Sequence, residues 1–399
     1  MTINFIPQQL KSDHLFLLIG ANTLPNWIAA NLLLQENGQL YLIHSQETYV
    51  TTQQLATRFV EHEFKQPIYI DVSDGSDAQQ IYRNVATAVK RIRDGHIGLN
   101  YSGGTKVMAV QSYRAVEDEL AFTNQSPVFS YLNARTLELC FDGKHPLIFV
   151  GDNIQLTIKD FFYLHFGKDW AWEQSPTQQV IAQPIIDELV KVHNRDYDYR
   201  LWKDQFKILN QQKGKVTLEW HERLTPLAQA IAADLPLTST VQQVCDQQTW
   251  PFEKPTQLVN WLEGKWLESY VLSVLQTNKA RYGIYDFGQG LEARTTGERI
   301  EVDVIATKGY QFHLLSCYEG SNKNRAKEHL FEAYMRATQI GGEEACTVLI
   351  CQTEEPESLE HDAALLWQAH DRIKVFGRRD LEDLADLLED WFNRKMRRR

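Results

Sequence analysis

The sequence predicts an α/β protein with a doubly wound parallel sheet in its N-terminal part and a second α/β domain in its C-terminal part. Two observations lead to this fold class. Short apolar runs alternate with helical patterns at the start of the 399-residue chain, and a different order of helices and strands fills its last part. Between them lies a segment with the pattern of polar helices. We therefore expect an N-terminal domain at 1–154, a helical connector at 155–256 and a C-terminal domain at 257–399.

The N-terminal domain is predicted from five short runs rich in Ile, Leu, Val, Tyr and Phe. These candidate strands are residues 14–19, 39–44, 68–72, 96–100 and 127–132. Helical spacing separates them at residues 28–34, 52–63, 77–93 and 105–119. Strands that alternate with helices are joined by crossover connections, so their sheet is parallel. A closing hairpin is expected at 136–141.

The remaining elements follow a different order. The connector has scattered aromatic residues on polar helical patterns, and Pro251 and Pro255 mark its end. Beyond it we expect a helix at 261–276, strands at 283–287, 300–307 and 311–317, a helix at 323–338, strands at 347–352 and 373–376, and a final helix from residue 380.

Composition excludes several classes of function. A net charge of -11 argues against broad binding to polyanions, so any contact with nucleic acid must be local. The five cysteines are never spaced as C-x-x-C, which indicates neither a disulfide framework nor a structural zinc site. No apolar run approaches the roughly 18 residues of a spanning helix, and the first residues do not resemble a signal peptide. We expect a cytoplasmic protein with no membrane partner.

The most informative segment is NYSGGTKVM, residues 100–108. A strand is expected to end at Asn100 and a helix to open at Thr105, with Ser102, Gly103 and Gly104 between them in a tight turn. Adjacent glycines let backbone N–H groups approach a ligand, the start of a helix favours an anion, and Lys106 adds a full charge. The segment matches neither the P-loop nor G-x-G-x-x-G. A turn needed only for packing is the simpler interpretation.

Position favours the ligand interpretation. In an open parallel sheet, ligands bind beyond the carboxyl ends of the strands near the point where the strand order reverses. Polar residues also follow the first two predicted strands, namely Asn22 and Thr23 after the first and Ser45 after the second. We expect these residues to join the glycine turn in one ligand site.

Two pairs of segments resemble a known family. IGANTLPNWIAANLL (19–33) together with NYSGGTKVM resembles a CRISPR-associated Rossmann fold (CARF) domain. LVNWLEGKWLESYVLSVL (258–275) and RIEVDVIATKGYQFHLLSC (299–317) resemble the restriction-endonuclease-like half of the cyclic-oligoadenylate-activated nucleases of type III CRISPR systems. Those proteins join a CARF sensor to a PD-(D/E)xK domain, and the resemblance spans both ends of this chain.

The resemblance implies a homodimer whose two CARF domains share one cyclic oligoadenylate, most often the tetra-adenylate. A ring with repeated phosphates suits an interface in which each subunit presents the same surface. Ligand binding is carried over to Asn22, Thr23, Ser102, Gly103, Gly104, Thr105 and Lys106.

Two acidic residues are candidate catalytic and metal-binding residues of the C-terminal domain. Asp303 interrupts a strand pattern, where a carboxylate usually needs a partner or a cation. Glu268 lies at the margin of an apolar helical face, where a solvated glutamate is the commoner outcome. The resemblance implies that such an aspartate, with a second acid and a lysine on the next strand, holds Mg²⁺ or Mn²⁺ for phosphodiester hydrolysis.

The chain departs from that motif, because Ser-Cys-Tyr (316–318) stands where E-x-K is expected. Serine is a poor ligand for a hard cation, and a phenol with a pKa of about 10 is neutral at pH 7. Glu319 could replace the acid through a one-residue slip, and Lys323 or Lys327 could supply the charge from the next helix. Solvent-facing positions are commoner for such residues. We expect metal-dependent cleavage to be weak or absent.

Three alternatives stay open. The protein could be an active metal-dependent endonuclease of single-stranded RNA or DNA with relocated catalytic residues. It could be a ring nuclease that cleaves its own messenger, with Lys106 stabilising phosphate charge and a ribose hydroxyl attacking. It could also bind the messenger only, to titrate it or to regulate transcription.

Overall fold

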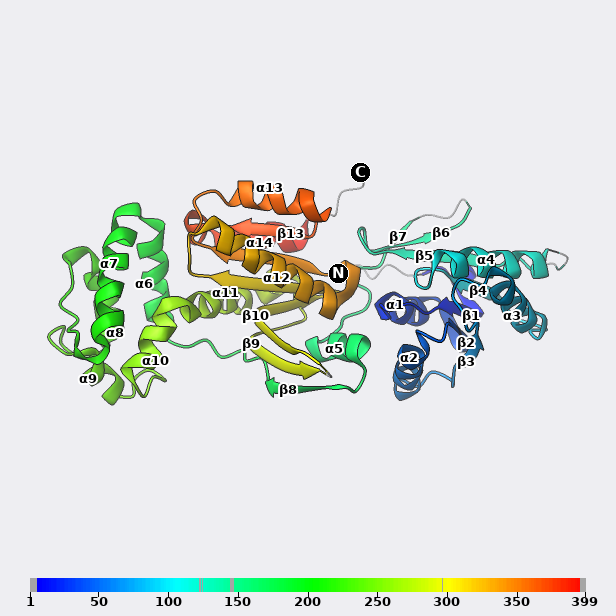
Figure 1. Ribbon diagram of the computed structural model, residues 1–399, viewed down its shortest axis with the longest axis horizontal. Coiled ribbons are helices and arrows are strands. Elements are labelled where there is room, and N and C mark those ends of the chain that lie inside the picture. Colours follow the sequence, from blue (N-terminus) through cyan, green and yellow to red (C-terminus); the bar gives the residue numbers. More distant parts are fainter. Residues whose placement is uncertain (1–5, 122, 124, 144–146, 296, 395–399) are drawn as a thin grey trace.

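The computed structural model describes residues 6–121, 123, 125–143, 147–295 and 297–394. Two sheets and a group of helices lie in a row, which makes the molecule elongated (Figure 1). The first sheet is at one end and the second sheet is in the middle. The helices of residues 183–260 form the other end, and in sequence they lie between the first strand of the second sheet and its remaining strands.

The first sheet has seven strands in the order β3-β2-β1-β4-β5-β6-β7. They are β1 (Ser12–Leu18), β2 (Leu34–His44), β3 (Ile68–Asp71), β4 (Ile97–Asn100), β5 (Val128–Asn133), β6 (Glu138–Phe141) and β7 (Ile148–Phe149). β1 to β5 pair in parallel, and β6 and β7 are antiparallel. The predicted α/β fold class is confirmed, and the strand order reverses between β1 and β4.

Helices cover both faces of this sheet. α1 (Leu24–Leu33) and α2 (Tyr49–Glu61) share a core with Leu15 and Leu17 of β1, whereas α3 (Ala78–Lys90) and α4 (Lys106–Leu120) share a core with Phe16 and Leu18. The alternation follows from the two-residue period of a strand, which points neighbouring side chains to opposite faces. Sheet and helices together are called the N-terminal domain below.

The second sheet has six strands in the order β13-β12-β11-β10-β9-β8. They are β8 (Trp170–Gln174), β9 (Asp286–Thr295), β10 (Arg299–Lys308), β11 (Gln311–Tyr318), β12 (Cys346–Cys351) and β13 (Ile373–Phe376). β8 to β11 are antiparallel neighbours, and β11 to β13 are parallel. This sheet and its helices are called the C-terminal domain.

Its helices also lie on both faces. α11 (Trp266–Tyr282) and α14 (Leu384–Asn393) pack on one face, and α5 (Ile158–Phe166) and α12 (Lys323–Gly341) pack on the other. α13 (Pro356–Trp367) lies beside α12 over the parallel edge of the sheet. The expected elements are present, but the strand expected at 283–287 begins later and runs to Thr295.

The segment 155–256 differs from the expected helical connector, because it is not helical throughout. It contains α6 (Gln183–Asn194), α7 (Asp196–Gln212), α8 (Thr225–Ala232) and α9 (Val241–Asp246), and α10 (Pro255–Asn260) follows. It also contains strand β8, which pairs with β9. Trp170 and Trp172 alternate along β8 and both pack against Phe162 of α5. Alternating aromatic residues favour a strand once a sheet edge is available to pair with it.

The two domains share one hydrophobic core. α1 and α2 of the N-terminal domain belong to the same cluster as α5, α12 and the facing side of β9 to β11. An ion pair of 2.8 Å between Arg135 and Asp371 adds a polar contact at this boundary. The shared core places the C-terminal domain against the α1/α2 face of the first sheet. The α3/α4 face points away from the C-terminal domain (Figure 1).

Within the described ranges, no helix has the length and apolar character that crossing a membrane requires.

Candidate functional site

The glycine turn lies at the switch point of the first sheet. Gly104 has a φ of +72°, a conformation that costs residues with a Cβ about 1 kcal/mol or more. A Cβ on Gly103 would lie 2.3 Å from the carbonyl oxygen of Leu18, and one on Gly20 would lie 3.0 Å from the backbone nitrogen of Gly104. The loop after β1 and the loop after β4 therefore pack backbone to backbone, and this close approach requires glycine.

Ser102 is held inside this turn. Its hydroxyl donates to Oδ1 of Asn100 at 2.6 Å and accepts from the backbone N–H of Leu132 at 2.7 Å. Asn100 is completely buried, and its Nδ2 donates to the hydroxyl of Ser130 at 3.1 Å. The predicted ligand residue Ser102 thus shapes the turn through its side chain.

Thr105 is the N-cap of α4, and its hydroxyl connects the loop after β3 to the glycine turn. Its hydroxyl accepts from the N–H of Met108 at 3.1 Å, as an N-cap does, and donates to the carbonyl oxygen of Gly75 at 2.7 Å. A Cβ on Gly75 would lie 3.6 Å from the Cβ of Ser45, so the loop after β2 reaches the same place. Ser45 itself is buried, and its N–H donates to the hydroxyl of Thr48 at 3.1 Å.

The exposed part of this cluster consists of Gly104, Thr105 and Lys106. The first turn of α4 presents backbone N–H groups and the positive end of the helix dipole there. Together with the Lys106 ammonium they form a surface suited to an anion such as a phosphate. We call Gly103, Gly104, Thr105 and Lys106 the anion turn.

Asn22 and Thr23 do not point their side chains at the anion turn. Thr23 is buried and donates to the carbonyl oxygen of Leu164 on α5 at 2.5 Å. Asn22 donates through Nδ2 to Oε2 of Glu344 at 3.4 Å. Both contacts reach the C-terminal domain, and no sequence pattern indicated them because the partners lie far along the chain.

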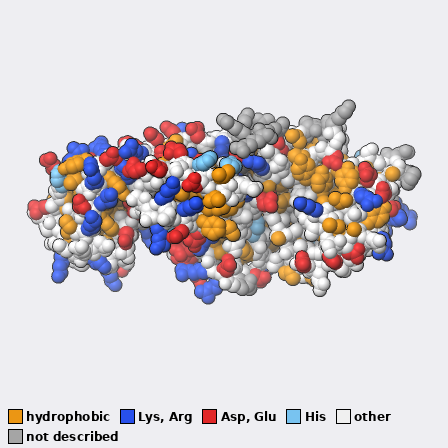
Figure 2. Space-filling view, turned by 45° about the horizontal axis from the view of Figure 1, so that its top comes forward, with side chains coloured by type: hydrophobic (Ala, Val, Ile, Leu, Met, Phe, Trp, Pro, Cys, Tyr) orange, Lys and Arg blue, Asp and Glu red, His pale blue; other side chains and the backbone are white. Residues whose placement is uncertain are grey.

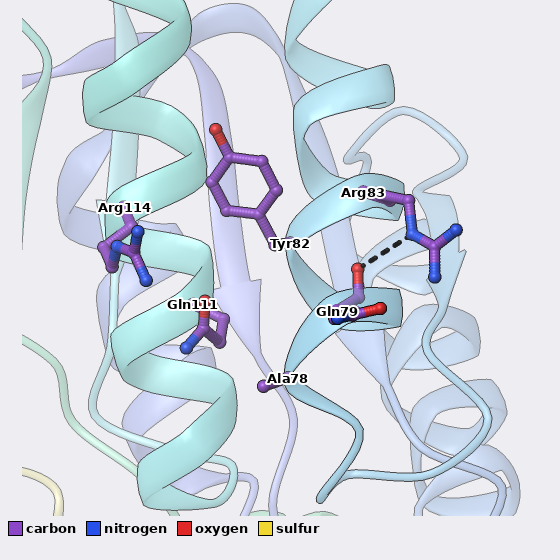
Figure 3. A pocket seen from close by; sticks show the side chains of 6 residues that line it. All are labelled: Ala78, Gln79, Tyr82, Arg83, Gln111 and Arg114. Carbon is purple, nitrogen blue, oxygen red and sulfur yellow. Dashed lines mark hydrogen bonds between the residues drawn. The ribbon is translucent and has the colours of Figure 1, made fainter.

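A groove that the sequence did not reveal runs between α3 and α4 (Figure 3). It has a volume of about 520 Å³ and is lined by Ala78, Gln79, Tyr82, Arg83, Gln111 and Arg114. Tyr82 lies between the two helices with Arg114 5.9 Å from its ring, and Arg83 points away from α4. Polar residues three to four apart on both helices are the pattern that could have indicated this face.

In the C-terminal domain, Asp303 lies where β10 and β11 separate. The two strands pair from Val304 and Leu315 toward their turn. Just beyond that pairing, Oδ2 of Asp303 accepts from the hydroxyl of Ser316 at 3.0 Å and from the N–H of Cys317 at 2.8 Å. Burial raises the pKa of Asp303, and these two donors act against the increase.

Glu268 lies close enough to Asp303 for their charges to interact. It occupies the first turn of α11 and is partly buried. Burial and the charge of Asp303 raise the pKa of Glu268 to about 8, against the effect of Lys265. The structure therefore brings together two carboxyl groups whose protonated forms are both favoured by burial.

Of the proposed replacements for E-x-K, Glu319 and Lys323 bond to residues other than Asp303 and Glu268. Glu319 accepts from Nε2 of Gln352 at 2.9 Å and contacts Nε2 of His193 at 2.8 Å. Lys323 donates to the hydroxyl of Ser358 on α13 at 2.9 Å. Lys327 is partly exposed on α12, and the described residues that line the cavity beside Asp303 include neither lysine.

That cavity has a volume of about 210 Å³. Its walls are Glu301, Val302, Asp303, Leu314, Ser316, His329, Glu332, Ala333 and Arg336. Within the described ranges, no three or more His, Cys, Asp or Glu side chains are grouped to hold a metal ion. Oδ2 of Asp303 already accepts from a hydroxyl and a backbone N–H, and the described residues that line this cavity include no lysine. The donor set therefore departs from the acid-and-lysine arrangement that holds Mg²⁺ or Mn²⁺ in the nucleases.

One face of the molecule has mixed charge. On the face shown in Figure 2, Lys and Arg side chains are interspersed with Asp and Glu. This face has no continuous basic surface of the kind that binds nucleic acid without sequence preference.

No protein-family model matches the chain, and no curated protein matches its sequence significantly. Solved structures do match its fold. Can2 from Sulfobacillus thermosulfidooxidans, solved in complex with cyclic tetra-adenylate, has a TM-score of 0.70 at 18% identity, covering 96% of this chain and 97% of Can2. The protein VC1899 from Vibrio cholerae has a TM-score of 0.70 at 16% identity, covering 95% of this chain and 98% of VC1899. The chain thus has the complete two-sheet fold of Can2 and VC1899, as the resemblance to CARF nucleases predicted.

Proposed function

We propose that this protein is an ancillary effector of a type III CRISPR system. It binds a cyclic oligoadenylate between the N-terminal domains of a homodimer and thereby controls a nuclease-like C-terminal domain. Among such rings, cyclic tetra-adenylate is the preferred ligand. One observation carries the proposal. The anion turn lies at the switch point of a chain that shares its whole fold with Can2, and Can2 was solved with cyclic tetra-adenylate.

The chemistry of the anion turn suits a cyclic nucleotide of this kind. Phosphodiester groups carry single negative charges, which the N–H groups at the start of α4 and the ammonium of Lys106 stabilise. The glycines allow a phosphate to approach the backbone without a Cβ between them. Asn22, Thr23 and Ser102 support the site by fixing the loops, because their side chains bond to other parts of the fold.

A homodimer completes the site by placing a second anion turn opposite the first. The α1/α2 face of the N-terminal domain packs on the C-terminal domain, so the α3/α4 face is the one available to a second copy. Val110 of α4 is 55% exposed on the helix that starts at the anion turn, and the groove beside Tyr82 can accept side chains. A two-fold axis beside α4 therefore gives a ring with repeated phosphates two equivalent contacts.

The C-terminal domain is proposed to have lost the metal-nuclease motif. Ser316 and Tyr318 occupy the positions of its acid and its lysine, and Ser316 donates to Asp303. The C-terminal domain then responds to the ligand by a change of conformation, and it does not hydrolyse a substrate at Asp303. An active endonuclease would need a cation site that this donor set does not form.

Titration calorimetry with cyclic tetra-adenylate tests the proposal. The wild type should release or absorb heat on binding, and Lys106→Ala should weaken binding about tenfold or more because a charged hydrogen bond is lost. Gly104→Val should also weaken it, since valine strains the turn. Lys207→Ala serves as the control, because Lys207 lies on α7 at the other end of the molecule and pairs with Asp204 at 3.1 Å. Absence of heat with the wild type would exclude the proposal.

A further inference from the structure

The loop after β1 contacts both the anion turn and the C-terminal domain. Gly20 packs against the backbone of Gly104, as described above. Two residues further on, Asn22 accepts from the N–H of Leu24 at 3.0 Å and donates to Glu344 at 3.4 Å. A Cβ on Gly342 would lie 2.4 Å from Nδ2 of Asn22, which shows how closely this side chain fits the C-terminal domain. A shift of this short loop would therefore change its contacts with both the anion turn and Glu344.

Glu344 receives this contact in the turn Gly342–Glu344, between α12 and β12. Its side chain is completely buried, and burial raises its pKa to about 7. Oε1 of Glu344 and the buried hydroxyl of Tyr310 have no hydrogen-bond partner in the part of the chain that the structure describes. A buried polar group without a partner costs about 1–3 kcal/mol, so the hydrogen bond from Asn22 stabilises this buried carboxyl group.

The β10–β11 hairpin starts at the same junction. The carbonyl oxygen of Gly309 in its turn accepts from the N–H of Leu156 at 3.0 Å, and a Cβ on Gly309 would lie 1.8 Å from the carbonyl oxygen of Gly151. Gln311, which opens β11, donates to the carbonyl oxygen of Glu344 at 3.2 Å. The turn of the hairpin is therefore held by the chain that leaves the N-terminal domain and by Glu344.

The other end of the hairpin carries the acidic site. Asp303 of β10 and Ser316 of β11 lie about 20 Å from the turn, the length of six strand residues. They are joined by the hydrogen bond at the point where the strands separate. The turn is held by the chain that leaves the N-terminal domain and by Glu344. A displacement of the turn would be carried along the paired strands to the point where they separate.

We propose that the hydrogen bond from Asn22 to Glu344 couples the anion turn to the Asp303 site through the β10–β11 hairpin. This inference rests on the proposed function, because it names the route by which a bound cyclic oligoadenylate acts on the C-terminal domain. The ligand favours one position of the loop after β1, and the Asn22–Glu344 contact carries this preference to the hairpin.

An exchange of donor and acceptor tests the contact. The samples are kept at about pH 9, above the pKa of about 7 of Glu344, so that its carboxyl group is ionised and cannot donate. Under these conditions Asn22→Asp keeps the oxygen that accepts from Leu24 but removes the N–H₂ group that donates to Glu344. Glu344→Gln alone keeps an acceptor for Asn22. In the double variant, the new amide at position 344 can donate to the new carboxylate at position 22, so the hydrogen bond is restored in the opposite direction. Asn31→Ala is the control, because Asn31 is exposed on α1 and donates to the carbonyl oxygen of Trp27 within its own helix.

Two readouts are measured on the same full-length samples. Calorimetry gives the affinity for cyclic tetra-adenylate, and hydrogen exchange of residues 303–318 gives the response of the hairpin when the ligand saturates. Asn22→Asp should reduce the ligand-induced change in exchange about fivefold. Glu344→Gln, the double variant and Asn31→Ala should retain a response close to that of the wild type.

The outcomes separate this inference from the proposed function. A wild type that binds the ring while exchange at 303–318 stays unchanged overturns the coupling and leaves the proposed function standing. An Asn22→Asp variant with the full response also overturns the coupling, as does a double variant no better than Asn22→Asp. A wild type that does not bind the ring contradicts the proposed function itself, and the coupling with it.

Discussion

At the scale of single residues, the two candidate sites differ in how the chain uses its polar groups. Around the anion turn, Ser102, Thr23 and Thr105 bond to the fold, which leaves backbone groups and Lys106 facing outward. Around Asp303, the neighbouring hydroxyl and N–H donors both bond to one oxygen, Oδ2, of the carboxyl group. The anion turn therefore presents free donors to an anion, whereas Oδ2 of Asp303 already accepts two hydrogen bonds from the protein.

Substitution of Gly103 should destabilise the N-terminal domain. In Gly103→Ala the new Cβ would meet the carbonyl oxygen of Leu18 at 2.3 Å, so the turn must move. We expect the free energy of unfolding to fall by about 1–3 kcal/mol. Denaturant titration measures the change. Gly297→Ala is the matched control, since a Cβ at Gly297 meets nothing within 4 Å, and an equal loss in both variants would contradict the close contact.

Glu344 should make stability depend on pH. Its pKa is raised to about 7 by burial, so the folded state holds a proton that the unfolded state has released near the ordinary value of 4.5. The stabilising effect is complete below pH 4.5 and is lost as pH rises through 7, by an amount of about 1–3 kcal/mol. Tyr310, Glu343 and Arg372 are the titratable groups around it.

Melting temperatures of the wild type and Glu344→Gln measure this dependence between pH 5 and pH 8. The difference, wild type minus variant, should decrease by a few degrees over this interval, because glutamine does not titrate. A constant difference would show that Glu344 titrates at its ordinary pKa.

At the scale of elements, α4 depends on its N-cap residue, Thr105, for both stability and position. Thr105→Ala removes the cap on Met108 and the bond to Gly75, and should lower the free energy of unfolding by about 1–2 kcal/mol. Thr105→Ser retains a hydroxyl and should restore most of it. Thermal or denaturant unfolding measures both variants. Equal stability of the alanine and serine variants would mean that the cap does not hold this helix.

Much of the architecture could be predicted from the sequence because it depends on local patterns. Apolar runs alternating with helical spacing predicted β1 to β5 and their helices, and the glycines of residues 103–104 predicted the turn before α4. β8 could not be predicted, since its pairing with β9 joins residues more than a hundred positions apart. The contact of Asn22 with Glu344 could not be predicted for the same reason, because the two residues are 322 positions apart.

At the scale of the whole molecule, one hydrophobic core contains side chains of both domains, so the two domains pack directly on each other. The chain places α1 and α2 between the first sheet and the elements that carry Asp303, so the loops at the switch point lie within reach of the C-terminal domain. The groove between α3 and α4 faces the other way. A dimer through that face leaves the junction between the domains unchanged in each subunit.

Metal-dependent cleavage should be weak or absent. Labelled single-stranded RNA and DNA, incubated with the protein, Mn²⁺ and cyclic tetra-adenylate, should remain intact, because Ser316 and Tyr318 stand where the motif has an acid and a lysine, and serine is a poor ligand for a hard cation. Asp303→Asn is the matched variant. Cleavage by the wild type that disappears in Asp303→Asn would show that the C-terminal domain is an active endonuclease and that its motif has been relocated rather than lost.

The central claim is that two anion turns share one ring. The most direct measurement is the stoichiometry of binding, from calorimetry with cyclic tetra-adenylate combined with the mass of the complex from light scattering. We predict one ring for every two chains, in a particle with the mass of a dimer. One ring for each chain, or a monomer that binds with undiminished affinity, would contradict the shared two-fold site.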